Sequence, residues 1–91
     1  MTVLGRLKDG RLIAKAALSS MKTAAAGGVY TSATITELRL VESILGVNIL
    51  TSNPSMSVAP QNMGILTNVV GLTVYMSAGG TATGEVTVIG V

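Results

Sequence analysis

The stretch from Ser43 to Gly84 restricts the fold of this chain more than any other part, because it contains no charged side chain. It is rich in Val, Ile, Leu and Thr, and Gly, Asn and Pro interrupt it. None of its apolar runs reaches the roughly 18 residues that a membrane helix needs. β-Branched residues between regularly spaced turn formers are typical of strands. The stretch therefore predicts sheet and not a membrane span.

Within this stretch, residues 65–76 are predicted to form one long or bent strand. Successive side chains of a strand project to opposite faces of the sheet. One face of this strand is apolar (Leu66, Val70, Leu72, Val74 and Met76), and the other is only half polar (Thr67, Val69, Thr73 and Tyr75). We expect Val69, Thr73 and Tyr75 to make an assembly contact, in which the Tyr75 ring packs against a partner and its hydroxyl reaches that partner or water.

The composition predicts one small domain with little charge on its surface. The chain has 91 residues, of which 11% are charged and 2% are aromatic, against roughly 25% charged in an ordinary soluble domain. Short strands between Gly and Pro turns predict an all-β fold, a small β-sandwich or jelly-roll-like domain at residues 29–91. Residues 29–42 are predicted to form its first strand. The alternative, a helix with Thr34–Glu37 as its capping box, is less favoured. Pro54 and Pro60 are expected in a loop or at a sheet edge.

The first 28 residues are predicted to be a separate basic arm or hairpin. Their basic side chains are Arg6, Lys8, Arg11, Lys15 and Lys22, against one acidic residue, Asp9. Asp9-Gly10 accepts the positive φ of a tight turn and favours a hairpin that pairs residues 3–8 with 11–15. A short Ala-rich helix within residues 11–26 and an extended arm are the alternatives. We expect this segment to dock through its basic residues on a neighbouring molecule, instead of closing the core of its own subunit.

Enzymatic chemistry is not expected, because the chain contains neither Cys nor His. Nucleophilic catalysis needs Ser, Cys or Thr beside a general base, and only Lys or a carboxylate is left for that role. Without thiolate or imidazole ligands, we predict no metal site, no cofactor and no small-molecule substrate. The basic segment has no interleaved aromatic residues to stack on bases, so nucleic acid is the weaker prediction for a partner. The amino terminus lacks the pattern of a secretory signal, so synthesis in the cytoplasm is expected.

Several runs carry a resemblance to a known class of protein: Gly5–Leu18, Val29–Val41 (VYTSATITELRLV), Leu72–Tyr75 and Glu85–Gly90. In composition they resemble small β-rich virion proteins of tailed phages, in which a low-complexity Ala/Thr leader precedes a β-sandwich. The resemblance implies a capsid (head) decoration or cement protein, or a tail-associated protein, located in the virion. It also implies a homo-oligomer and a capsid or tail protein as partner. A basic nucleic-acid-binding accessory protein and a cellular filament or surface subunit are the alternative functions.

Overall fold

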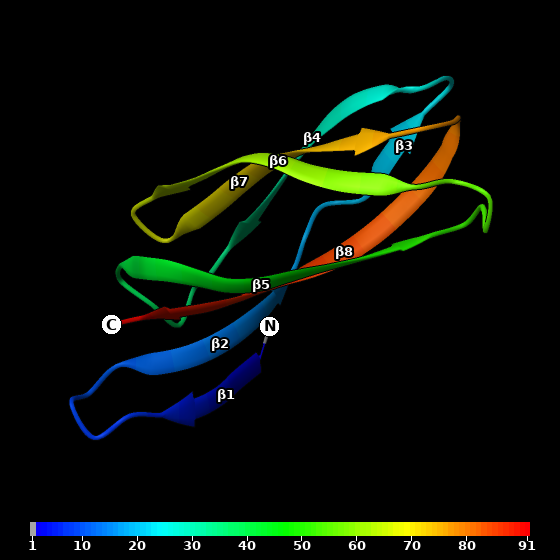
Figure 1. Ribbon diagram of the computed structural model, residues 1–91. Helices are drawn as coiled ribbons and strands as arrows, with labels where there is room; N and C mark the ends of the chain where they lie inside the picture. Colours follow the sequence, from blue (N-terminus) through cyan, green and yellow to red (C-terminus); the bar gives the residue numbers. More distant parts are fainter. Residues whose placement is uncertain (1) are drawn as a thin grey trace.

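The structure, a computed structural model, describes residues 2–91 and contains strands and turns but no helix in that range (Figure 1). Its strands are β1 (Thr2–Arg6), β2 (Leu12–Ala17), β3 (Met21–Thr23), β4 (Gly27–Thr34), β5 (Val41–Thr51), β6 (Val58–Leu66), β7 (Val69–Met76) and β8 (Gly80–Gly90). They form two antiparallel sheets, A and B, so the prediction of an all-β chain is confirmed. The molecule is elongated and measures 44 × 21 × 16 Å.

Sheet A is built around β8, the last strand of the chain. β5 lies along one edge of β8, while β2 and β3 follow each other along the opposite edge. Val88 illustrates the arrangement, because it lies between Ala14 of β2 and Ile44 of β5. β1 pairs with the far side of β2 and is the outermost strand. Strands from both halves of the chain therefore meet on its C-terminal strand.

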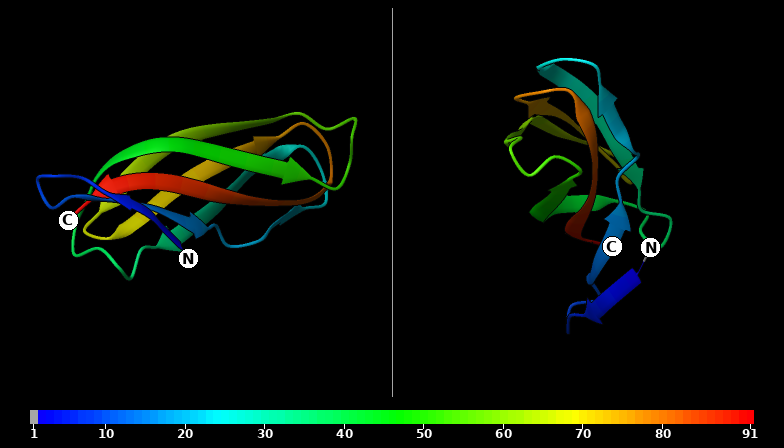
Figure 2. Two further views of the ribbon diagram at one scale, coloured as in Figure 1. Left: turned by 90° about the horizontal axis from the view of Figure 1, so that it is seen from below. Right: turned by 90° about the vertical axis from the view of Figure 1, so that its right-hand side faces the viewer.

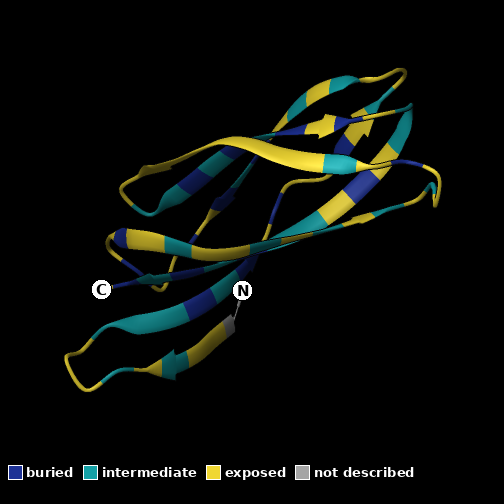
Figure 3. Ribbon diagram, viewed as in Figure 1, coloured by how far each residue is buried: buried dark blue, intermediate teal, exposed yellow. Residues whose placement is uncertain are grey.

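Sheet B has the order β4-β7-β6, with β7 in the centre. β4 pairs with β7 along its whole length. β6 and β7 form a hairpin with an irregularity between Gln61 and Gly64. β6 is an edge strand and is exposed along nearly its whole length (Figure 3). Pro60 lies on this edge strand and Pro54 in the loop before it, as the sequence predicts for residues that cannot sit in a central ladder.

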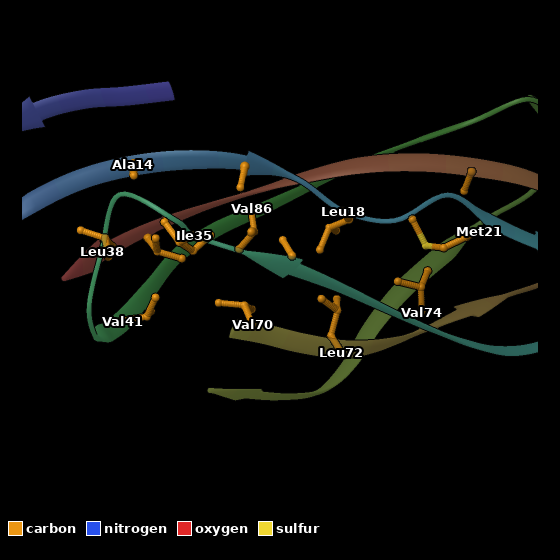
Figure 4. Close-up of a cluster of buried hydrophobic side chains, with 14 of the residues drawn as sticks. Ala14, Leu18, Met21, Ile35, Leu38, Val41, Val70, Leu72, Val74 and Val86 are labelled. Carbon is orange, nitrogen blue, oxygen red and sulfur yellow. The ribbon is translucent and has the colours of Figure 1, made fainter. Parts of the chain in front are cut away.

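The two sheets share one apolar core (Figure 4). Alternate residues of the central strands point into it, and they are mostly β-branched or aliphatic because the chain has no Phe or Trp. The core strands supply Val70, Leu72, Val74 and Met76 of β7 with Val86 and Val88 of β8, and the connecting segments supply Leu18, Ile35, Leu38 and Met56. Val70, Leu72, Val74 and Met76 therefore share one face of β7, as the alternation predicts, and that face is buried.

The sequence predicts that residues 1–28 are separate from a body at residues 29–91. In the structure, this segment contributes strands to both sheets. β2 and β3 pair with β8, and the core of the subunit includes Ala14, Ala16, Leu18 and Met21. The expectation that this segment does not close its own core is therefore wrong. Backbone hydrogen bonds with β8 hold this segment in place. Its small side chains led to the prediction of a separate arm, because they do not reveal those hydrogen bonds. The β1–β2 hairpin alone extends from this part of the body (Figure 2).

The hairpin predicted at the N-terminus has its turn at Asp9-Gly10. Gly10 has a φ of 91°, a conformation that other residues rarely adopt. The helix considered within residues 11–26 does not form, because β2 and β3 pair with β8 there. The strand predicted at residues 29–42 ends at Thr34 as β4, and residues 35–40 form a turn before β5 begins.

Residues 65–76 belong to two strands and not to the single strand predicted. β6 ends at Leu66, where Thr67-Asn68 turn the chain into β7. Thr67 has a φ of 57°, which is unusual for a β-branched residue. Distant segments hold this turn, because Val41 N–H donates to the Thr67 carbonyl and Ile35 N–H to the Asn68 carbonyl, each at 2.8 Å. Leu66 pairs with Val69 and so lies on the opposite face from that predicted.

Candidate assembly surface

Sheet B carries no charged side chain on any of its strands. The six basic and four acidic residues of the chain lie on the strands of sheet A, in the β1–β2 turn, or in the segment between β4 and β5. The exposed side of sheet B is therefore covered only by uncharged groups. A partner can cover this side without removing water from a charged group, which would be costly.

The outer face of sheet B consists of rows of side chains, because residues that pair across neighbouring strands project to the same side. In the order β4, β7, β6 the rows are Gly28, Tyr75 and Ala59; Tyr30, Thr73 and Gln61; Ser32, Gly71 and Gly64; and Thr34, Val69 and Leu66. The first row has one large side chain between two small ones, and the third row has only small residues. The face therefore has a projection at Tyr75, while the Tyr30 ring covers Gly71.

Both tyrosines of the chain lie on this face, Tyr75 with 46% and Tyr30 with 68% of its surface exposed. The structure thus brings the predicted contact residues Val69, Thr73 and Tyr75 to one surface, at alternate positions of β7. Sequence reasoning missed Tyr30, which lies on another strand. No local pattern would have found it, because the register of β4 on β7 places Tyr30 beside Thr73. Exposed tyrosines combine apolar area with a hydrogen-bonding hydroxyl and are enriched at protein interfaces.

A hollow of about 300 Å³ lies beside Tyr30 on the same face. It is lined by Tyr30, Asn62, Gly64, Ile65, Leu66, Val69 and Gly71. Tyr30 leans over Gly71, so that a Cβ at position 71 would meet the Tyr30 hydroxyl. A pocket with this lining suits an uncharged apolar or aromatic group.

The structure does not gather the predicted basic residues into one patch. Lys15 and Lys22 pair with residues of β8 that are six positions apart, which is roughly 20 Å along a strand. Arg6 lies opposite Leu12, and the alternation of β2 places Leu12 and Lys15 on opposite faces of the sheet. The basic groups of the N-terminal segment therefore point in different directions from separate places.

Two of these basic residues also have acidic partners within the subunit. Arg11 donates from its backbone N–H to Asp9 Oδ1 at 3.1 Å and from Nε to Asp9 Oδ2 at 2.7 Å. The backbone hydrogen bond first, and the guanidinium second, hold the pKa of Asp9 below its ordinary value. Lys15 Nζ lies 3.5 Å from Glu85 Oε1 across the strands. These pairs reduce the charge that Arg11 and Lys15 offer to a partner.

Other kinds of site find less support in the part of the chain that the structure describes. Residues 2–91 contain no group of three or more acidic side chains that could hold a metal ion. They also contain no helix long and apolar enough to cross a membrane. No protein-family model, curated protein or solved structure matches the chain. The outer face of sheet B, with its two exposed tyrosines, is the candidate site.

Proposed function

We propose that the chain is a non-enzymatic structural subunit of a viral particle. In this proposal it serves as a capsid decoration or cement protein, or as a tail-associated protein. Its partners are further copies of itself and a capsid or tail protein. It is made in the host cytoplasm and resides in the virion. Its two sheets act as a small jelly-roll-like β-sandwich that presents one face for assembly.

The observation that carries this proposal is the uncharged outer face of sheet B, with exposed Tyr30 and Tyr75 and with Leu66 at 76% exposure. A face of this kind, in a molecule whose charges all lie elsewhere, is expected to be covered by protein. The compositional resemblance to small β-rich virion proteins of tailed phages supports the viral setting.

The alternative functions fit the arrangement of residues less well. A nucleic-acid-binding protein would present its basic groups along one groove or face. Here Lys15 and Lys22 lie far apart, and Arg11 and Lys15 have acidic partners. Nucleophilic catalysis would need a general base beside a nucleophile, and without His or Cys only Lys or a carboxylate is left for that role.

The viral setting is tested by locating the protein in cells that produce it. An antibody raised against the purified chain would be used on fractions of a density gradient. We expect the chain in the fractions that contain particles with nucleic acid, and we expect it to stay there at high salt. Release at moderate salt would indicate binding to nucleic acid through phosphates. Recovery in filaments without a genome would contradict the proposal and favour a cellular filament subunit.

The role of the surface is tested by Tyr75→Thr, with Leu50→Thr on the outer face of sheet A as the matched control. Leu50 is 65% exposed and lies opposite Thr83 of β8. Loss of an interface tyrosine typically weakens association about tenfold or more, so sedimentation should show a smaller assembled fraction for Tyr75→Thr alone. Its urea midpoint should stay close to the parent's, because Tyr75 is half exposed. Equal losses of assembly and stability would make Tyr75 an ordinary core residue.

A further inference from the structure

Met63 is far more exposed than the other methionines of residues 2–91. Its exposed fraction is 51%, against 7% for Met56, 1% for Met21 and 0% for Met76. Those three side chains belong to the apolar core. Because the chain has no Cys, its thioethers are the groups that peroxides oxidise most readily. The four thioethers have the same chemistry, so burial decides which of them reacts.

The local structure of β6 explains the exposure of Met63. β6 is an edge strand and has a neighbour in its sheet on one side only. Between Gln61 and Gly64 it has an irregularity, which leaves Asn62 and Met63 without a partner in the register with β7. Asn62 has a φ of 53°, so the backbone leaves the extended conformation immediately before Met63. The Met63 side chain therefore has no paired neighbour in the ladder to cover it.

We propose that Met63 is a reversible oxidation site, which peroxides convert to the sulfoxide while the chain stays folded. A lone pair of the Met63 sulfur attacks one oxygen of hydrogen peroxide, and the O–O bond breaks. The proton of the transferred oxygen goes to the leaving hydroxide, which becomes water. The sulfur is oxidised by two electrons and the peroxide is reduced by two. In the reverse step, methionine sulfoxide reductases take two electrons from a dithiol and release the oxygen as water.

The position of the sulfoxide decides what it does to the fold. At Met63 the polar S–O group stays in water, because half of the side chain is exposed. Asn62 and Gly64 line the hollow on the outer face of sheet B, but Met63 does not, so its oxidation leaves that lining unchanged. At Met76 the same group would be buried in an apolar core, which is costly without a hydrogen bond. The fold therefore tolerates oxidation at Met63 and resists it in the core.

The test compares the oxidation rates of the individual methionines in the folded chain. The purified protein is treated with hydrogen peroxide, and tandem mass spectrometry of proteolytic fragments gives the sulfoxide fraction at each position over time. We expect Met63 to react at least about tenfold faster than Met21, Met56 and Met76, because a buried sulfur reacts only after the fold opens around it. In concentrated urea the four rates should become similar. Met1, which lies outside the described residues, is quantified separately.

Met63→Leu is the matched variant, because Leu keeps an apolar side chain of similar size at an exposed position. Under conditions that oxidise Met63 completely, the mass of the parent should rise by one oxygen more than the mass of Met63→Leu. The oxidised parent should keep its circular dichroism spectrum and its urea midpoint. Incubation with methionine sulfoxide reductases and a dithiol should remove the added oxygen.

Similar oxidation rates at Met63 and at the core methionines of the folded chain would overturn the proposal. Loss of the sheet signal on oxidation of Met63 alone would overturn it as well, and so would a sulfoxide that the reductases do not remove from the folded chain. The rates are measured on the parent, so the test holds even where Met63→Leu does not fold. The inference does not rest on the proposed function, because these rates describe the free chain, whereas the density gradient shows where the chain resides.

Discussion

Replacement of Thr31 by Val tests the hydrogen bonds that tie sheet B to sheet A. The Thr31 side chain is fully buried, donates to the Ser19 carbonyl at 2.7 Å and lies 2.8 Å from Ser19 Oγ. Ser19 belongs to the segment between β2 and β3, and its N–H also donates to the Ser32 carbonyl of β4 at 3.0 Å. Val keeps the shape of Thr but removes both hydroxyl contacts. Because the loss leaves Ser19 oxygens without this partner, we expect the free energy of unfolding to fall by about 1–2 kcal/mol.

Urea unfolding followed by circular dichroism measures this loss. The protein concentration must be held constant, because association would add to the apparent stability. Thr83→Val, at an exposed position on the outer face of sheet A, is the control and should stay within about 0.5 kcal/mol of the parent. A double-mutant cycle with Ser19→Ala should give a coupling of at least about 0.5 kcal/mol. A Thr31→Val variant as stable as Thr83→Val, or strictly additive with Ser19→Ala, would refute the reasoning.

Two glycine-related predictions use the same unfolding assay. Gly90→Ala should cost about 1–3 kcal/mol, because its Cβ would meet the Leu40 carbonyl, which also accepts a hydrogen bond from Val91 N–H at 3.0 Å. Gly46→Ala meets nothing within 4 Å and should be neutral or stabilising by up to about 1 kcal/mol; equal urea midpoints for the two variants would contradict this account. Thr67→Gly should add about 0.5–1 kcal/mol of stability, because Gly adopts a φ of 57° without steric cost. A lower urea midpoint for Thr67→Gly would show that a contact of the Thr67 side chain stabilises the fold by more than the strained φ costs.

The sequence by itself determined the class of the fold and the faces of individual strands. β-Branched residues between Gly, Asn and Pro turns indicated an all-β chain, and Asp9-Gly10 indicated the first hairpin. Alternation placed Val69, Thr73 and Tyr75 on one face of β7. These properties were accessible because backbone preference and the two-residue period of a strand depend only on neighbours in the sequence.

Only the tertiary structure decided which strands meet. Residues 12–23 join the core because they pair with β8, near the other end of the chain, and no local pattern encodes that pairing. Tyr30 comes to lie beside Thr73, and Gly64 beside Gly71, through the registers of β4 and β6 on β7. The turn at Thr67 is held by hydrogen bonds from segments distant in sequence. The register between strands is set by the packing of both sheets around one core, so a surface shared by several strands exists only once the chain has folded.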